Sequence, residues 1–185
     1  MAEIILITGG ARSGKSRHAQ ALGEARGGSR LFIATSPVID EEMRQRIARH
    51  QADRQGQGWR TVEEPLRPAA VLAGNPEAEV VLLDCLTLWI SNLLFEAEEP
   101  EYYTEAMIAE LAKELTGAAR NRRGTVLIVT NEVGLGIVPE NPLARRYRDL
   151  VGRCNQTIAA GADRVDLVVC GIPLTIKGEK HDPAQ

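Results

Sequence analysis

The stretch EIILITGGARSGKS, residues 3–16, decides the fold of this chain. Its first half is an apolar run typical of a buried strand. Residues 9–16 fit the pattern G-x-x-x-x-G-K-[ST], in which a glycine-rich turn joins a strand to a helix. A helical stretch, Ser16–Ala25, follows at once. A glycine turn that matches by coincidence is the alternative, but the flanking strand and helix favour a phosphate-binding loop, or P-loop.

The residue types of this motif suit a polyphosphate. Glycines let successive backbone N–H groups point toward phosphate oxygens, and the helix N-terminus adds its positive dipole end. Lys15 is expected to reach the β- and γ-phosphates, and the Ser16 hydroxyl to coordinate Mg²⁺. The predicted nucleotide-binding residues of the loop are Gly9, Gly10, Ala11, Arg12, Ser13, Gly14, Lys15 and Ser16.

Outward from the loop, short apolar runs alternate with longer helical patterns. The predicted strands are Glu3–Thr8, Arg30–Ala34, Glu79–Asp84, Thr125–Thr130 and Arg164–Cys170, with shorter ones at Arg60–Glu63 and, at a sheet edge, Leu174–Lys177. Apolar residues recur at helical spacing in 108–118 and 143–158. Nearly continuous apolar strands alternating with helices predict a three-layer α/β fold with a mostly parallel central sheet.

Composition is that of an ordinary globular domain. The chain has 185 residues, of which 44% are hydrophobic and 25% charged, so a disordered or fibrous chain is excluded. We expect a single domain over residues 1–185, with a frayed tail at 178–185 and a solvated acidic loop at 96–101. A net charge of −3 argues against a protein built to coat nucleic acid.

The three cysteines have no metal or redox spacing, which favours free, mostly buried thiols in a reducing compartment. The apolar N-terminal run is too short for a signal peptide core or a membrane span. We therefore expect a cytoplasmic protein.

Asp84 ends a buried strand, where a P-loop enzyme needs a second residue to organise its metal. It is a candidate Mg²⁺ ligand together with Ser16. The alternative is that Asp84 caps the helix that begins near Cys85. A GTPase is disfavoured because the chain has no N-K-x-D stretch for reading guanine.

A second group of charged residues lies in the expected helix Asp40–Arg54. His50 falls on one face with Arg46 and Arg54, and cationic neighbours would keep its imidazole neutral and nucleophilic. The pattern by itself favours a plainer reading, a histidine at the core boundary of a charged helix. We expect His18 at the surface, with a position near the phosphates as the alternative, and His181 in the polar tail. No histidine pair predicts a zinc site.

Taken together, several motifs resemble one family. They are ITGGARSGKSRHAQ at 7–20, FIAT at 32–35, D-x-E-M-x-x-R-I-x-x-H-x-x-x-R at 40–54, W-x-T-x-E at 59–63 and TNEVGLGIVPENPLARRYRDLVGRCNQ at 130–156. In this order they resemble the bifunctional adenosylcobinamide kinase/adenosylcobinamide-phosphate guanylyltransferase of cobalamin biosynthesis. The resemblance runs from residue 4 to about residue 177.

The resemblance implies two reactions and a RecA-like P-loop fold. ATP or GTP would phosphorylate the aminopropanol hydroxyl of adenosylcobinamide. GMP would then pass from GTP, through a GMP–histidine intermediate, to that phosphate, giving adenosyl-GDP-cobinamide and pyrophosphate. The histidine of the family motif corresponds to His50, which becomes the catalytic candidate beside Lys15. The family is commonly homotrimeric.

Further candidate residues follow from position. Ala34, Thr35 and Ser36 end a strand expected beside the P-loop and should line the nucleotide site. The residues after His50 are candidates for GTP contacts: Gln51, Ala52, Asp53 and Arg54. Glu63 is a candidate for reading guanine, or else a surface acid at a strand end.

Asn131 and Glu132 end a central strand and are candidates for polarising the acceptor hydroxyl or holding the metal. Arg145, Arg146 and Arg148 are expected to bind phosphate or to form a solvated helix face.

Two rival functions remain open on sequence. The first is a P-loop kinase of another small metabolite without guanylyl transfer, in which His50 is dispensable. The second is a nucleotide-dependent assembly module. No compact motif marks the residues that contact the corrinoid. The sequence also leaves open which nucleotide donates the phosphate in the kinase step and whether both activities are retained.

Overall fold

The computed structural model describes residues 1–36, 56–97 and 102–178. One seven-stranded sheet runs through them in the order β3-β2-β4-β5-β1-β6-β7. Its strands are β1 Glu3–Gly9, β2 Arg30–Ala34, β3 Trp59–Glu63, β4 Val80–Asp84, β5 Thr125–Val129, β6 Arg164–Val169 and β7 Ile172–Lys177. All neighbours pair in parallel except β7, which runs antiparallel to β6 at one edge. The predicted sheet is confirmed, including its C-terminal edge strand.

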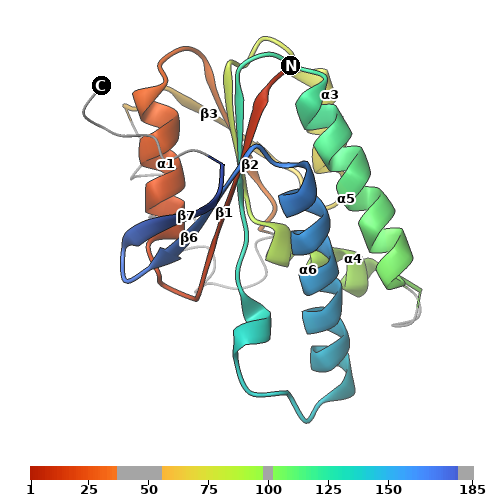
Figure 1. The fold of residues 1–185 in the computed structure, drawn as a ribbon. Coiled ribbons are helices and arrows are strands. Elements are labelled where there is room, and N and C mark those ends of the chain that lie inside the picture. Colours follow the sequence, from red (N-terminus) through yellow and green to blue (C-terminus); the bar gives the residue numbers. More distant parts are fainter. Residues whose placement is uncertain (37–55, 98–101, 179–185) are drawn as a thin grey trace.

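Helices cover both faces of this sheet, so the predicted three-layer α/β fold is confirmed. They are α1 Lys15–Ala25, α3 Pro68–Gly74, α4 Leu86–Glu96, α5 Glu105–Arg120 and α6 Pro142–Gly161, with a short 3₁₀ helix η1 at Val133–Leu135. Figure 1 shows α1 on one face and α3, α4, α5 and α6 on the other. None of the helices in the described parts of the chain is both long and apolar enough to cross a membrane.

The core has two parts because the central strands are apolar on both faces. Ile4 and Leu6 of β1 pack with residues of α4, α5 and α6, whereas Ile5 and Ile7 pack with Ala19 of α1. Successive side chains of a strand point to opposite faces, so this division assigns every position of β1 to a face.

Helix α6 shows how local sequence sets an element. The side chain of Asn141 accepts hydrogen bonds from the backbone N–H groups of Leu143 and Ala144 at 2.8 and 3.2 Å, and Pro142 fills the first helical position. The helix then buries a stripe at helical spacing: Leu150, Val151, Cys154 and Ile158. The same apolar repeat predicted the helix from sequence.

Two short elements were not predicted, α3 and η1. At seven and three residues, both are too short to show a clear periodic pattern. The acidic loop expected at 96–101 begins later, because Glu96 is still helical and 98–101 lie outside the described residues. The helix expected at Asp40–Arg54 also lies outside them, as does most of the expected frayed tail.

The sheet order places a topological switch point beside β1. Strands β1 and β5 are neighbours, but the helices that follow them, α1 and α6, lie on opposite faces (Figure 1). In open α/β sheets such a switch point opens a crevice at the carboxyl ends of the strands, where ligands bind. The glycine-rich loop after β1 and residues Thr130–Glu132 after β5 both lie at this edge.

Candidate active site

The loop between β1 and α1 has the conformation that its glycines allow. Gly14 has φ 95°, in the left-handed region, and immediately precedes Lys15, the first residue of α1. A Cβ at Gly9 would lie 2.4 Å from the backbone oxygen of Val168, so only glycine fits there. The predicted strand–loop–helix arrangement is thus present, with the helix beginning one residue earlier than expected.

Lys15 folds back over the loop. Its Nζ donates to the backbone oxygen of Gly10 at 2.9 Å, and the residue is 7% exposed. Its charge also reaches the end of β4. Burial and the neighbouring Asp84 carboxylate raise the pKa of the Cys85 thiol to about 11, and Lys15 opposes that rise. The ammonium is therefore held at the loop, where phosphates would need a cation.

Ser13 adds a hydrogen-bonding group that the protein itself leaves unused. Its backbone oxygen accepts a hydrogen bond from Gly171 N at 2.8 Å, which joins the loop to the turn between β6 and β7. Its hydroxyl is buried and has no hydrogen-bond partner among the described residues. Buried hydroxyls are normally satisfied, so an orphan inside a glycine-rich loop fits a phosphate oxygen as the missing partner.

Asp84 faces the same side of the sheet as α1. It is in register with Val129 of β5, which is in register with Ile7 of β1, and both of these pack on the α1 side. The N-cap position of α4 is Cys85, with no side-chain cap, so Asp84 does not cap this helix. Ser16 is the second residue of α1. A carboxylate and a hydroxyl are thus available on one face of the crevice, and both are hard oxygen donors suited to Mg²⁺.

The residues that follow β5 are joined by hydrogen bonds to β1 and to α4. Thr8 Oγ1 donates to Glu132 Oε1 at 2.6 Å, and Glu132 N donates to the backbone oxygen of Gly9 at 3.1 Å. Asn131 Nδ2 donates to Thr87 Oγ1 of α4 at 2.9 Å. The sequence pointed to Asn131 and Glu132 but gave no sign of these partners, because the contacts depend on strand order.

The expectation that Ala34–Ser36 follows a strand beside the P-loop is wrong in one respect. Strands β4 and β5 lie between β2 and β1. Thr35 is fully buried, and its hydroxyl bonds both the N–H and the carbonyl of Cys85 at 2.8 Å, which joins β2 to β4. Ser36 Oγ is buried without a partner in the described part of the chain.

Glu63 lies still farther from the loop. It ends β3, the strand at the edge opposite β7, and its side chain is exposed. Four strand spacings separate β3 from β1, or about 19 Å at the usual distance between neighbouring strands. Glu63 and Lys15 can therefore contact one ligand only if that ligand extends across the sheet edge.

His18 was expected at the surface, and this is wrong. Its Nε2 lies 2.9 Å from Oδ2 of Asp166, a fully buried carboxylate of β6. Burial by itself would raise the pKa of Asp166, but hydrogen bonds from His18, Arg164 and Thr175 lower it to about 2. The sequence did contain a signal for this contact, namely an aspartate within the apolar run of β6. A buried carboxylate requires hydrogen-bond donors, and His18 is one of them.

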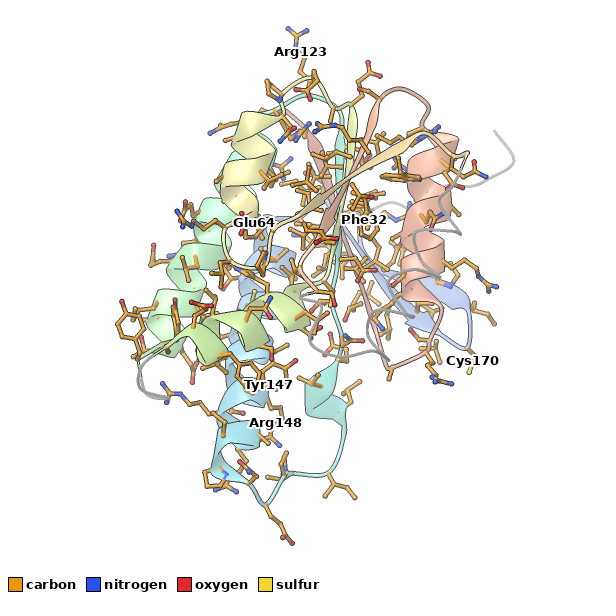
Figure 2. All side chains as sticks on the ribbon, turned by 180° about the vertical axis from the view of Figure 1, so that it is seen from behind. Phe32, Glu64, Arg123, Tyr147, Arg148 and Cys170 are labelled. Atoms are coloured by element: carbon orange, nitrogen blue, oxygen red, sulfur yellow. The ribbon has the colours of Figure 1, made fainter. Side chains whose placement is uncertain are left out.

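The three arginines of α6 mostly bond within the chain. Arg145 donates to the backbone oxygen of Pro139 at 2.9 Å, Arg146 donates to that of Tyr103, and Arg148 pairs with Asp149 at 3.3 Å. Figure 2 shows Arg148 near the start of this helix. The Arg145 bond holds the loop before α6, the Arg146 bond joins α6 to the segment before α5, and the Arg148 pair lies within α6.

The remaining predicted residues cannot be placed. His50 and the four that follow it lie outside the described residues, as does His181. The site that the structure describes therefore consists of the glycine-rich loop with Lys15, Asp84 at the end of β4 and Glu132 after β5.

The sequence matches the family described as cobinamide kinase / cobinamide phosphate guanyltransferase over residues 5–176. It is 46% identical over 185 residues to the bifunctional adenosylcobalamin biosynthesis protein CobU of Escherichia coli, covering 94% of this chain and 99% of the relative. The Salmonella typhimurium protein of that name is 45% identical over 183 residues, with the same coverage. The bifunctional adenosylcobalamin biosynthesis protein CobP of Pseudomonas aeruginosa is 45% identical over 178 residues, covering 94% of this chain and 97% of the relative.

Proposed function

Because the chain belongs to the cobinamide kinase / cobinamide phosphate guanyltransferase family, we propose that it catalyses both reactions of that name. It phosphorylates the aminopropanol hydroxyl of adenosylcobinamide with ATP or GTP. It then transfers GMP from GTP to the new phosphate, releasing pyrophosphate. The observation that carries the proposal is the loop itself, with Lys15 folded over it and the buried Ser13 hydroxyl without a partner.

The kinase step needs charge neutralisation more than covalent chemistry. The acceptor oxygen forms a bond to the γ-phosphorus, and the bond from that phosphorus to the β-bridging oxygen breaks. Lys15 and the N–H groups of residues 9–16 bind the phosphate oxygens as negative charge shifts to the leaving diphosphate. Ser16 and Asp84 would hold Mg²⁺, which would supply further positive charge to the phosphates.

The guanylyl transfer is assigned to His50. A ring nitrogen attacks the α-phosphorus of GTP, an N–P bond forms, and pyrophosphate leaves. A phosphate oxygen of cobinamide phosphate then attacks the same phosphorus, the N–P bond breaks, and His50 is restored. The support is the family motif around His50. Gln51, Ala52, Asp53, Arg54 and Glu63 are proposed to contact GTP, and Ala34 and Ser36 to lie along its path.

We further propose a homotrimer in the cytoplasm. Strand β7 lies at a sheet edge and exposes Ile172, Leu174 and Ile176, which alternate along it and so share one face. An exposed apolar edge strand favours pairing with another chain. Light scattering of the wild type and of Leu174→Lys would test whether this edge joins identical copies.

Covalent labelling tests the assignment of His50. The protein is incubated with Mg²⁺ and GTP labelled at the α-phosphate, denatured, and examined by intact mass and peptide mapping. We expect an acid-labile GMP adduct on the peptide that contains His50, absent in His50→Ala and retained in His181→Ala. A folded, GTP-binding protein that forms no adduct would instead support the rival function, a P-loop kinase of another small metabolite.

A further inference from the structure

Glu132 is fixed beside the phosphate loop by its main chain and by its side chain. Its N–H donates to the backbone oxygen of Gly9, the last residue of β1, at 3.1 Å. Its Oε1 accepts from Thr8 Oγ1 at 2.6 Å, and Thr8 is 4% exposed. Two bonds to consecutive residues of β1 hold this carboxylate in one place.

The second oxygen of this carboxylate is available to a ligand. Within the described residues, Glu132 Oε2 has no hydrogen-bond donor, and the carboxylate has no ion-pair partner. Glu132 is also only partly buried. A group that donates a proton can therefore reach Oε2 without breaking any bond that holds the chain.

A negative charge at this position is otherwise unfavourable. The loop beside it is built to bind a polyanion, and like charges at close range repel. A glutamine would accept the Thr8 hydrogen bond equally well without that cost. A carboxylate at this position therefore indicates a role that needs its charge or its basicity. It would either bind a metal ion or accept a proton from the acceptor hydroxyl.

The faces of the sheet distinguish these two. Thr8 follows Leu6 in the alternation of β1, so its side chain points to the α4–α6 side. Asp84 is in register with Ile7 and points to the α1 side, where Ser16 also lies. Glu132 is therefore tied to the side of the crevice opposite the two candidate metal ligands.

We propose that Glu132 binds the acceptor hydroxyl and takes its proton in the phosphoryl transfer. This rests on the proposed kinase function. The hydroxyl proton passes to Oε2 as the oxygen forms its bond to the γ-phosphorus. The bond between that phosphorus and the β-bridging oxygen breaks, and its electron pair remains on the departing diphosphate. No further reactant is required.

The experiment compares Glu132→Gln with the wild type in two assays. The first follows phosphorylation of cobinamide by ATP, and the second follows formation of the GMP adduct from GTP. We expect kcat for phosphorylation to fall by about 10²–10⁴-fold, the range typical of a lost general base, with the KM for ATP changed less than about threefold. The rate of adduct formation and the Mg²⁺ dependence are expected to stay unchanged. Glu140→Gln, at an exposed acid of the same segment, is the matched control and should keep full activity.

Other results would overturn the proposal. Loss of both activities with a raised Mg²⁺ requirement would make Glu132 a metal-binding residue. If Glu132→Gln phosphorylated cobinamide at the wild-type rate, the role of Glu132 would be only structural, joining the segment after β5 to β1. Wild-type protein that forms the adduct but does not phosphorylate cobinamide would remove the kinase function and this role with it, whereas an active wild type confines any failure to Glu132.

Discussion

At the amino end of the sheet, charged side chains find partners within the protein, whereas at the carboxyl end several polar groups do not. Arg120 donates to Asp163 at 2.7 Å, and the largely buried Arg122 donates to the backbone oxygens of Leu72, Asn75 and Ala78. At the other end, the hydroxyls of Ser13 and Ser36 are buried without partners in the described parts of the chain. Nε of Arg30 and of Arg122 is also buried without a partner among the described residues, so the amino end is closed by most but not all of its bonds, whereas the carboxyl end leaves two hydroxyls open to a ligand.

This difference indicates how stability and activity are divided. Buried polar groups that are satisfied hold a fold together, and those left unsatisfied reduce its stability unless a ligand completes them. Substitutions at the amino end should therefore lower stability and leave turnover per folded molecule unchanged. Substitutions at the carboxyl end should do the reverse, and each prediction below tests one side of this division.

The largest effect is expected for Lys15→Ala. Lys15 Nζ donates to the backbone oxygen of Gly10 in the loop, and we propose that its main task is to meet phosphates. Nucleotide-dependent turnover should fall by about 10²–10³-fold, the usual result of removing one stabilising donor from an active site. Steady-state kinetics would measure this loss, and thermal unfolding would show a melting temperature near that of the wild type. Lys113→Ala, at an exposed lysine paired with Glu110 on α5, is the control. An active Lys15→Ala protein would contradict the assignment of the loop.

Arg122→Leu tests the opposite end. The substitution leaves the carbonyl groups at the end of α3 without their donor and should lower the free energy of unfolding by about 2–3 kcal/mol. For a chain of this size that corresponds to a fall in Tm of about 4–10 °C. Urea denaturation measures the first quantity and calorimetry the second.

The neighbouring Arg123 provides a matched control for this change. Figure 2 shows Arg123 extending away from the protein, so Arg123→Leu should change stability by less than about 0.5 kcal/mol. If Arg122→Leu lost activity per folded molecule while keeping its stability, the amino end would not be the purely structural end.

Asp166 provides a prediction about how the free energy of unfolding depends on pH. Its pKa in the folded protein is about 2, below the ordinary value of 3.8, so the native state binds fewer protons than the unfolded state between these two pH values. The stabilisation is complete above about pH 4 and is lost as pH falls toward 2. The difference corresponds to about 2 kcal/mol. Urea denaturation of the wild type at several values across this window would measure it.

Asp166→Asn should lack this component of the pH dependence. It should also be less stable at neutral pH, because Arg164 would remain buried without its carboxylate. Asp149→Asn, at an exposed acid, is the control and should keep the wild-type slope between pH 4 and 2. An equal slope in Asp166→Asn would assign the effect to other carboxylates.

Local pattern was enough to predict the parallel strands, the P-loop and the amphipathic helices α5 and α6, because each depends on residues close in sequence. Strand order was not readable in this way. The expectation that Ala34–Ser36 borders the P-loop failed because β4 and β5, from later in the chain, insert between β2 and β1. The same limit concealed the bond from Thr8 to Glu132 and that from His18 to Asp166, whose partners are more than a hundred residues apart.

The smallest effect concerns the reactivity of the three thiols. It tests whether solvent reaches every group at the carboxyl end of the sheet or only some of them. Cys85 lies at that end, yet burial raises its pKa to about 11, and burial in α6 raises that of Cys154 to about 12. Cys170 is exposed in the turn between β6 and β7, as Figure 2 shows. A disulfide reagent at pH 8 should therefore modify one thiol in the native protein and three after unfolding, because thiolates react and buried thiols do not form them.

Cys170→Ser identifies the reactive thiol and should reduce the native count to zero. Because Cys170 is not among the groups assigned to the nucleotide, this variant should keep wild-type turnover. Rapid native modification of Cys85 would mean that the end of β4 is accessible to solvent. The unsatisfied hydroxyls of the carboxyl end would then have water as their partner, and the contrast between the two ends of the sheet would no longer point to a ligand.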